Sequence, residues 1–276
     1  MEISSLIKAA AIGITTLLAP ILMIGQNIYK GKLAPKLSHV READVMWMKR
    51  VWRRIDLRQK FNHPYYYPER PLDGRQSLFD NLVEAIYKDE IRAFDPGPLG
   101  EDDMFQRQFN REKFDNLLLS RDTVSTIDPF TLLDSKTVVE TEIKGVDIIM
   151  YELKEEWFFD KQRSVMDVRI IGISPVIYYT NAETGDIEGL KNLFWLYFPE
   201  CRYVFQNFFV YNGGNDAMRM SFDDLFWKRQ FSSYIHKESN VFDRNVNPSW
   251  DGLDALLESE NIKQEMFKIE HDVWHL

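Results

Sequence analysis

The sequence contains few of the residue patterns that mark an active site. It has no GxGxxG or GxxxxGK[ST] loop, no HExxH and no GxSxG, so the usual signatures of nucleotide binding, zinc-dependent hydrolysis and serine hydrolysis are absent. His271 and His275 have the i, i+4 spacing of metal ligands on one helix face, but a third ligand is not evident. The sequence therefore predicts no metal and no cofactor.

Cysteine is almost absent, since Cys201 is the only one in 276 residues. An internal disulfide is excluded. We interpret Cys201 as a small buried apolar residue in a core strand, and an intermolecular disulfide is the alternative. A thiol dyad with His236 would need an accessible, electropositive pocket, and the apolar neighbours of Cys201 argue against one.

Positive charge is scarce overall, because 34 Lys and Arg residues face 43 Asp and Glu residues and the formal net charge is -9. This balance argues against nonspecific nucleic-acid binding, and we expect no nucleic-acid partner. The exception is the segment from Lys36 to Arg75, where ten basic residues outnumber five acidic ones. A basic segment on an acidic body favours pairing with another subunit or with an acidic partner.

Long apolar runs are confined to the N-terminus. Lys8 precedes an apolar stretch from Ala9 to Ile24 that is interrupted by Pro20. We interpret residues 1–25 as a secretory signal peptide, and an uncleaved membrane anchor is the alternative. Residues 26–37 have no apolar period and are expected to form an extended arm. One α+β domain is predicted over residues 38–276.

The most regular pattern lies between Glu155 and Tyr203. β-Branched residues crowd the segment 164–178, turn residues occupy 181–185, and bulky apolar residues resume from Leu193 to Val204. Because β-branched and aromatic residues favour strands, these segments predict a long central hairpin. Further strands are expected at 91–94, 146–159 and 205–211. The predicted fold class is α+β, with a mainly antiparallel sheet built on this hairpin, flanked by helices and preceded by the extended arm.

Helices are predicted from apolar residues at 3.6-residue spacing and from capping residues. We expect helices over residues 38–56, from Ser77, from Ser221, and from Gly252 to the end of the sequence. The last helix has a predicted apolar face of Leu253, Leu256, Leu257, Met266, Phe267 and Trp274. Residues 100–125 are charged and weakly patterned, and we interpret them as a surface excursion.

The predicted helix over 38–56 and the residues that follow it carry the candidate binding surface. One face is apolar and basic stripes surround it. Arg and Trp are among the residues that most often anchor protein interfaces, so we expect a protein partner to contact Trp47, Lys49, Arg50, Arg53, Arg54 and Arg58. An anionic lipid surface is the alternative partner for a basic, aromatic helix.

Adjacent carboxylates occur at 102–103, 155–156 and 223–224. Acid–base catalysis needs two carboxyl groups whose pKa values are pushed apart by burial, whereas these pairs are typical of helix starts and solvated edges. We therefore predict no catalytic residues. The alternative is a periplasmic, hydrolase-like enzyme with a site near residues 212–224 that uses Asp223 and Asp224.

Two long strings, EEWFFDKQRSVMDVRIIGISP at Glu155–Pro175 and LFWLYFPECRYVFQNFFVYN at Leu193–Asn212, resemble the GldN/PorN family of periplasmic gliding-motility and type IX secretion proteins of the Bacteroidota. The resemblance extends to residues 43–64, 74–86, 220–244 and 252–276, and is weakest from Phe94 to Val146. Strings of this length are more specific than a short catalytic motif.

The resemblance implies a non-enzymatic structural subunit of a periplasmic ring that supports protein secretion across the outer membrane. In gliding species it also implies adhesin export and motility. The implied partners are an outer-membrane lipoprotein of the GldK/PorK type, the periplasmic part of a GldM/PorM-type motor protein, and further copies of the chain. The implied location is the periplasm, in association with the outer membrane through a partner. The family has no catalytic residues to carry over.

Overall fold

The computed structural model describes residues 33–72, 74–98, 100, 102–127, 134–180, 187–210, 219–240, 246 and 252–273, with the backbone alone for residues 120–141 and 180. The chain divides into two units, Met1–Leu33 and Ala34–Leu276, and the second contains every element below. The predicted signal peptide, residues 1–25, lies outside the described residues, as do residues 26–32 of the predicted arm. Residues 33–37 of that arm form neither helix nor strand. The single domain over 38–276 stays a prediction.

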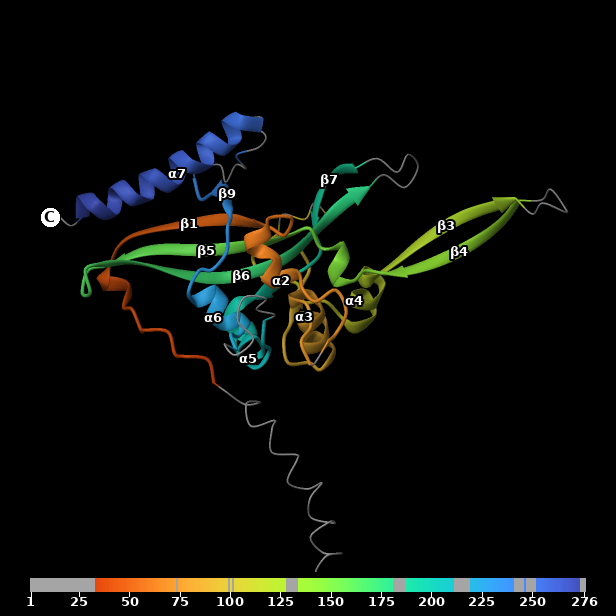
Figure 1. The fold of residues 1–276 in the computed structure, drawn as a ribbon. Helices are drawn as coiled ribbons and strands as arrows, with labels where there is room; N and C mark the ends of the chain where they lie inside the picture. The colour runs from red at the N-terminus through yellow and green to blue at the C-terminus, as the bar shows by residue number, and fades with distance from the viewer. Residues whose placement is uncertain are drawn as a thin grey trace, which may run out of the picture. The chain divides into compact units, whose positions relative to one another are not determined.

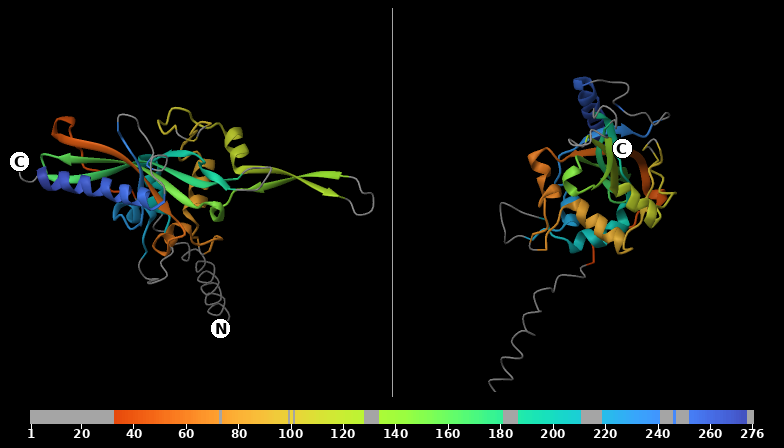
Figure 2. Two further views of the ribbon diagram at one scale, coloured as in Figure 1. Left: turned by 90° about the horizontal axis from the view of Figure 1, so that it is seen from above. Right: turned by 90° about the vertical axis from the view of Figure 1, so that its right-hand side faces the viewer.

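An antiparallel sheet of seven strands forms the centre of the second unit, in the order β2-β8-β6-β5-β1-β9 with β7 also paired to β6. The strands are β1 (Val45–Asp56), β2 (Ala93–Phe94), β5 (Met150–Asp160), β6 (Val165–Thr180), β7 (Ile187–Asn192), β8 (Trp195–Tyr197) and β9 (Tyr234–Glu238). A separate antiparallel pair, β3 (Leu119–Ile127) and β4 (Asp134–Glu142), extends away from this sheet in Figure 1 and Figure 2. The predicted α+β class and mainly antiparallel sheet are confirmed.

Helices connect and flank these strands. The described residues contain α2 (His63–Tyr66), α3 (Leu78–Tyr87), α4 (Arg111–Leu118), α5 (Phe198–Asn207), α6 (Phe222–Trp227) and α7 (Gly252–Val273), with short 3-10 turns at Glu42–Asp44, Lys60–Asn62 and Gly145–Asp147. Figure 1 shows α7 beside β9 and β1, and α5 and α6 close to β6. Among the described residues, none of these helices combines the length and apolarity that a membrane crossing requires.

The central hairpin exists, and its strand β6 matches the strand predicted over residues 164–178, but its partner in the hairpin is β5 rather than the segment that begins at Leu193. β5 and β6 form it, in register from Asp160 opposite Val165 to Met150 opposite Val176, with the turn at residues 161–164. The predicted strand Leu193–Val204 is wrong beyond Tyr197, because α5 begins at Phe198. Pro199 occupies the first turn of α5, where its missing N–H costs no hydrogen bond. The apolar residues Phe198, Cys201, Val204 and Phe205 then follow helical spacing and are buried.

The predicted helix over residues 38–56 is also wrong. Val45–Asp56 is strand β1, paired along its length with β5 and, from Val51 to Arg54, with β9. The spacing of Met48, Trp52 and Ile55 fits a helix, but Val51, Arg53 and Ile55 fit a strand equally well. Pairing on both edges decides between the two, because strand preference depends on packing against neighbours rather than on the residues alone.

Of the other local predictions, some are confirmed and some are wrong. α3 and α6 begin as expected, because the hydroxyls of Ser77 and Ser221 accept hydrogen bonds from the backbone N–H of Asp80 at 3.2 Å and of Asp224 at 3.1 Å. The short strand near 91–94 is confirmed as β2. The predicted strand over 205–211 is wrong, since α5 continues to Asn207. The predicted excursion over 100–125 contains α4 and most of β3.

The main core lies between the sheet and helices α2 to α6. Its fully buried members include Ile55, Tyr151, Leu153, Ile173 and Phe194. A second cluster joins Val51 of β1 and Ile235 of β9 to Ile262 and Met266 of α7. Of the predicted apolar face of α7, only Met266 is buried, while Trp274 lies outside the described residues and the rest are exposed: Leu253, Leu256, Leu257 and Phe267. Helix α7 contacts the sheet through a different face, which includes Ile262 and Met266.

Gly172 of β6 lies where a loop crosses the sheet. A methyl group at Gly172 would stand 2.6 Å from the ring carbon Cζ of Phe105 and 3.2 Å from Cε3 of Trp195. Phe105 packs edge-on against Phe94 and Trp195 with centroid distances of 5.6 and 6.3 Å. The absence of a side chain at Gly172 therefore lets this aromatic cluster close over the strand.

We expect Gly172→Ala to lower the free energy of unfolding by about 1–3 kcal/mol, because overpacking displaces the Phe105 ring. Urea denaturation followed by tryptophan fluorescence measures the change. The matched control is Gly189→Ala in β7, where no atom lies within 4 Å of the added methyl group. Equal stability of the two variants would contradict this account.

Candidate partner interface

Strand β1 carries five of the six predicted partner-binding residues, and Arg58 follows it closely. The neighbouring strands bring acidic residues opposite these basic ones, since Arg50 is in register with Glu156 and Arg54 with Glu152. Opposite charges facing each other across a strand pair stabilise the pairing. The structure therefore brings the predicted residues together on one strand and gives every charged one an internal partner.

Arg53 is the most deeply placed of the six. Its Nε lies 3.0 Å from Oε2 of the fully buried Glu155, whose Oε1 lies 2.9 Å from Nη1 of Arg229. Both guanidinium groups also lie over the Trp157 ring, at 5.6 and 5.2 Å from its centroid. Burial lowers the pKa of Arg53, and the negative charge of Glu155 opposes that effect. This triad is an internal part of the fold.

Arg54 belongs to a second buried group with Glu152 and His236. The Nε of Arg54 and the Nε2 of His236 each lie 3.1 Å from a carboxylate oxygen of Glu152. Burial disfavours the charged form of Glu152, but His236 and Arg54 outweigh it and lower its pKa to about 2. Burial lowers the pKa of His236. Near neutral pH the arrangement is an ionised carboxylate that accepts a hydrogen bond from Arg54 and lies beside an imidazole whose charged form is disfavoured by burial.

Trp47, Lys49 and Arg50 occupy the outer half of β1. Lys49 Nζ lies 2.6 Å from Oε2 of Glu238 in β9, and Arg50 Nη2 donates to Oε1 of Glu156 at 2.8 Å. The half-buried Trp47 packs against the second hydrophobic cluster, the one that contains Val51 and Met266. This half of β1 therefore holds β9 and α7 in place.

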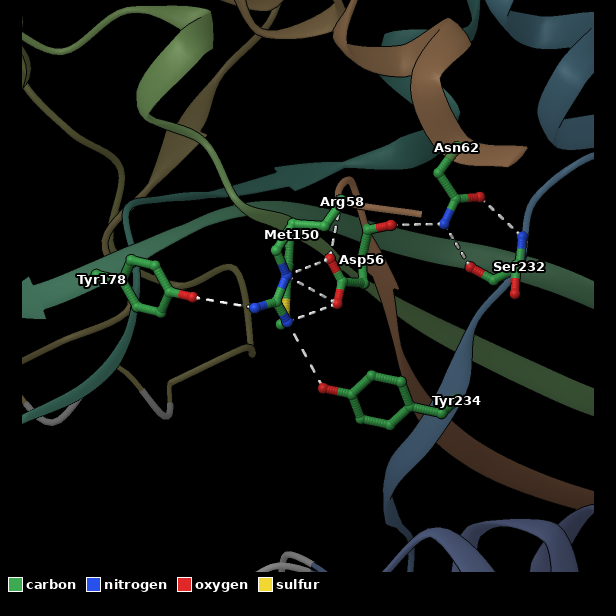
Figure 3. Close-up of polar contacts among 7 residues, drawn as sticks. All are labelled: Asp56, Arg58, Asn62, Met150, Tyr178, Ser232 and Tyr234. Atoms are coloured by element: carbon green, nitrogen blue, oxygen red, sulfur yellow. Dashed lines mark hydrogen bonds and ion pairs between the residues drawn. The ribbon is translucent and has the colours of Figure 1, made fainter. Parts of the chain in front are cut away.

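Arg58 lies just beyond β1, in the group of polar residues shown in Figure 3. Its Nη2 donates to Oδ2 of Asp56 at 2.7 Å, its backbone N–H donates to Oδ1 at 2.9 Å, and its Nη1 reaches the Tyr178 hydroxyl at 3.4 Å. These hydrogen bonds lower the pKa of Asp56, against the opposing effect of burial.

Asn62 fixes the chain that follows this group. Its Nδ2 donates at 2.8 Å to the carbonyl oxygens of both Asp56 and Ser232, and its Oδ1 accepts from the Ser232 N–H at 2.8 Å. The end of β1 is thus tied to the segment that leads into β9. The Arg58 side chain remains 64 % exposed, against 39 % for Arg50 and 9 % for Arg53.

A cavity of about 410 Å³ opens beside β1 and is lined in part by Trp52, Glu152, His236 and Lys237. Asp103, which the sequence analysis considered only as one of a pair of adjacent carboxylates, accepts a hydrogen bond from Trp52 Nε1 at its Oδ2 at 2.6 Å, and this oxygen lies 3.2 Å from Lys154 Nζ. Lys154 stands opposite Trp52 in register. The pairing of Trp52 with Lys154 can be predicted from the sequence only if β1 is first recognised as a strand.

The residues of the enzymatic alternative have structural partners. Arg202 donates to both carboxylate oxygens of the buried Asp223, at 2.8 and 3.0 Å. The Asp224 carboxylate accepts from the backbone N–H of Ser221 at 3.2 Å and closes the capping box of α6. Residues 211–218 of that proposed site lie outside the described residues.

Cys201 lies away from any accessible site, and the predicted histidine pair falls partly outside the described residues. Cys201 is fully buried in the main core, and burial raises the pKa of its thiol, which confirms the interpretation as a buried apolar residue, although in α5 rather than a strand. The described residues contain no group of three or more potential metal ligands, and His275 lies outside them.

We expect Arg53→Ala to cost about 3–5 kcal/mol of unfolding free energy, because it leaves the buried carboxylate of Glu155 with Arg229 alone. Denaturation in urea gives the value. Arg50→Ala is the matched control on the same strand, and the half-exposed pair that it breaks contributes no more than about 1 kcal/mol. A comparable loss of unfolding free energy in both variants would show that burial does not make the Arg53 pair more stabilising than the Arg50 pair.

Glu152 predicts an acid-sensitive stability. Its pKa is about 2 in the folded chain and 4.5 as the reference value, so its contribution is complete above about pH 5 and is lost as the pH falls from 4.5 towards 2. The shift corresponds to about 3 kcal/mol. Unfolding free energies measured between pH 7 and pH 3 should fall less steeply for Glu152→Gln. The control is Glu156→Gln in the same strand, which should follow the original chain.

The family comparison agrees with the resemblance found in the long sequence strings. Residues 40–275 match the model of the family described as gliding motility associated protein GldN. No curated protein matches the chain. The matched residues include all seven strands of the main sheet and both charged groups of β1. Because the match covers most of the chain, this protein belongs to the GldN family of gliding motility associated proteins.

Proposed function

We propose that this chain is a non-enzymatic structural subunit of a periplasmic ring of the type IX secretion system. In that role it supports protein secretion across the outer membrane and, in gliding species, export of the surface adhesins used for motility. The observation that carries the proposal is membership of the GldN family over residues 40–275. The chain acts in the periplasm and associates with the outer membrane through a partner.

The internal charge pairs of β1 support a scaffolding role. Salt bridges hold Arg53 and Arg54 inside the sheet, Asp223 joins α6 to α5 through Arg202, and Asp224 caps the start of α6. A subunit that transmits or resists force benefits from interactions that link strands distant in sequence. Asp223 and Asp224, the residues that the enzymatic alternative would use, instead stabilise α6 and its contact with α5.

The proposed partners are an outer-membrane lipoprotein of the GldK/PorK type, the periplasmic part of a GldM/PorM-type protein, and neighbouring copies of the chain. We assign the contact surface to β1 and its end. Arg58 and Arg50 present charge to solvent there, while Trp47, Lys49, Arg53 and Arg54 hold the strand in place. Exposed arginines can form bidentate pairs with carboxylates of a partner.

The test is purification from the native membrane in mild detergent through a tag at the C-terminus, followed by mass spectrometry and electron microscopy. Recovery of a lipoprotein in constant ratio, within ring-shaped particles, is the expected result. Recovery of a single chain free of partners, from cells with an active secretion system, would contradict the ring assignment.

Arg58→Ala should reduce recovery of the partners roughly 30-fold if Arg58 contributes about 2 kcal/mol, as an interface hot spot does. The control is Arg92→Ala, because Arg92 is 57 % exposed and also pairs with a carboxylate, that of Glu200. Both variants should melt within a few degrees of the original chain. Equal recovery with both variants would remove Arg58 from the contact.

A further inference from the structure

The longest strand of the sheet has one unpaired stretch. β6 pairs with β5 from Val165 to Val176. On its other side it pairs with β8 at Gly172 and Ile173 and with β7 from Val176 to Thr180. Within the described part of the chain, no strand pairs with that side of Val165–Ile171. We call this stretch the open edge.

Exposure and hydrogen bonding agree with this topology. Every residue of the open edge is partly or fully exposed, whereas Gly172 to Val176 are buried. The backbone N–H of Val168 donates to the side-chain Oδ1 of Asp167 at 2.9 Å rather than to a strand. Because alternate residues of a strand direct their N–H and C=O groups to the same side, Met166, Val168 and Ile170 present theirs outward.

A groove of about 490 Å³ runs beside the open edge. Its far walls are Phe198 and Arg202 of α5, Phe226 and Trp227 of α6, and the segment Lys36–Ser38. Its lining combines apolar side chains with five cations and two carboxylates: Lys36, Arg163, Arg169, Arg202 and Arg229 against Asp167 and Asp223. Three of these cations already face carboxylates, since Arg163 pairs with Asp160 and Asp167, Arg202 with Asp223, and Arg229 with Glu155.

The groove already holds extended backbone. Arg202 Nη1 donates to the carbonyl oxygen of Pro35 at 2.8 Å, and Arg169 donates to that of Ser38. The segment around Pro35 has no helix or strand and makes no backbone pairing with the open edge. The guanidinium groups of this groove therefore bind an extended chain while the edge beside it stays open.

We propose that the open edge of β6 accepts an extended, acidic segment of a partner protein by strand addition. The backbone of that segment would pair with Met166, Val168 and Ile170, and apolar side chains at alternate positions would enter the groove. Its carboxylates would meet Arg169 and Lys36, neither of which has a carboxylate partner among the described residues. A second copy of this chain is the competing occupant, and the experiment below distinguishes it from an acidic segment.

This inference does not depend on the ring assignment. If rings assemble normally but the open edge binds no strand, only the strand-addition proposal is refuted. A chain that binds the strand but forms no ring would refute only the assembly.

The probe is a synthetic peptide of alternating valine and glutamate, long enough to pair with residues 165–171. Amide hydrogen exchange of the full chain is measured with and without it. At a peptide concentration about 100 times its Kd, exchange at Met166 and Ile170 should slow about 100-fold. A peptide of alternating valine and lysine is the charge control and should cause no slowing.

Val168→Pro is the matched variant. It removes the backbone N–H that points outward and donates to Asp167, and it leaves the β5 ladder intact, since proline is tolerated at sheet edges. Val168→Ala keeps the N–H. The peptide should protect Val168→Ala like the original chain and should not protect Val168→Pro, with both variants folded by circular dichroism.

Three outcomes would overturn the proposal. The first is no slowing of exchange with the glutamate peptide, and the second is equal protection by the lysine peptide. The third is protection that rises with protein concentration when no peptide is present, because that would assign the edge to a second copy of the chain.

Discussion

The register between β1 and β5 is the constraint on which the rest of this structure depends. It places Arg50 opposite Glu156 and Arg54 opposite Glu152, and it brings Glu155 within reach of Arg53. A slip of one residue would turn each of these side chains to the other face of the sheet and leave buried charges without partners. The charges thus specify the alignment of two strands about 100 residues apart in sequence, as the separation of 98 between Arg54 and Glu152 shows.

The same strand joins two hydrophobic cores. Ile55 belongs to the main core with the helices α3, α5 and α6, while Val51 belongs to the cluster formed with β9 and α7. The buried group of Arg53, Glu155 and Arg229 lies between them along β1. A polar layer of this kind is stable only when all of its members are satisfied. A movement of α7 relative to the main core would therefore have to break the ion pairs of Arg53, Glu155 and Arg229.

The two sides of the sheet differ in how far their edges are covered. One side of β1 is covered by β9 and tied down through Asn62 and Ser232. β6 is covered by β7 and β8 over its second half only. An uncovered strand edge is a site where another chain can pair. The cationic side chains beside the open edge of β6 suit the extended, acidic segment proposed above. The fold offers two surfaces of different chemistry, the arginine end of β1 and the open edge of β6.

Local signals in the sequence identified some elements correctly. Ser77 and Ser221 cap their helices because a serine hydroxyl needs only the N–H three residues later. The β-branched run of β6 is a strand because such side chains pack well on a pleated surface, and β5 and β8 supply the neighbouring strands. The same signals failed for β1, where a helical spacing of Trp52 and Ile55 coexists with strand alternation, and for Leu193–Val204, where a strand of three residues turns directly into α5.

The sequence by itself determined the α+β class, the starts of α3, α6 and α7, and the family, because these depend on composition, on short-range contacts and on long characteristic strings. Only the tertiary structure decided that the basic residues of β1 lie in a sheet and that Arg53 is buried while Arg58 is exposed. The physical reason is that their partners, Glu155, Glu152 and Glu238, come from strands distant in sequence. Burial of an arginine is favourable only where such a carboxylate meets it.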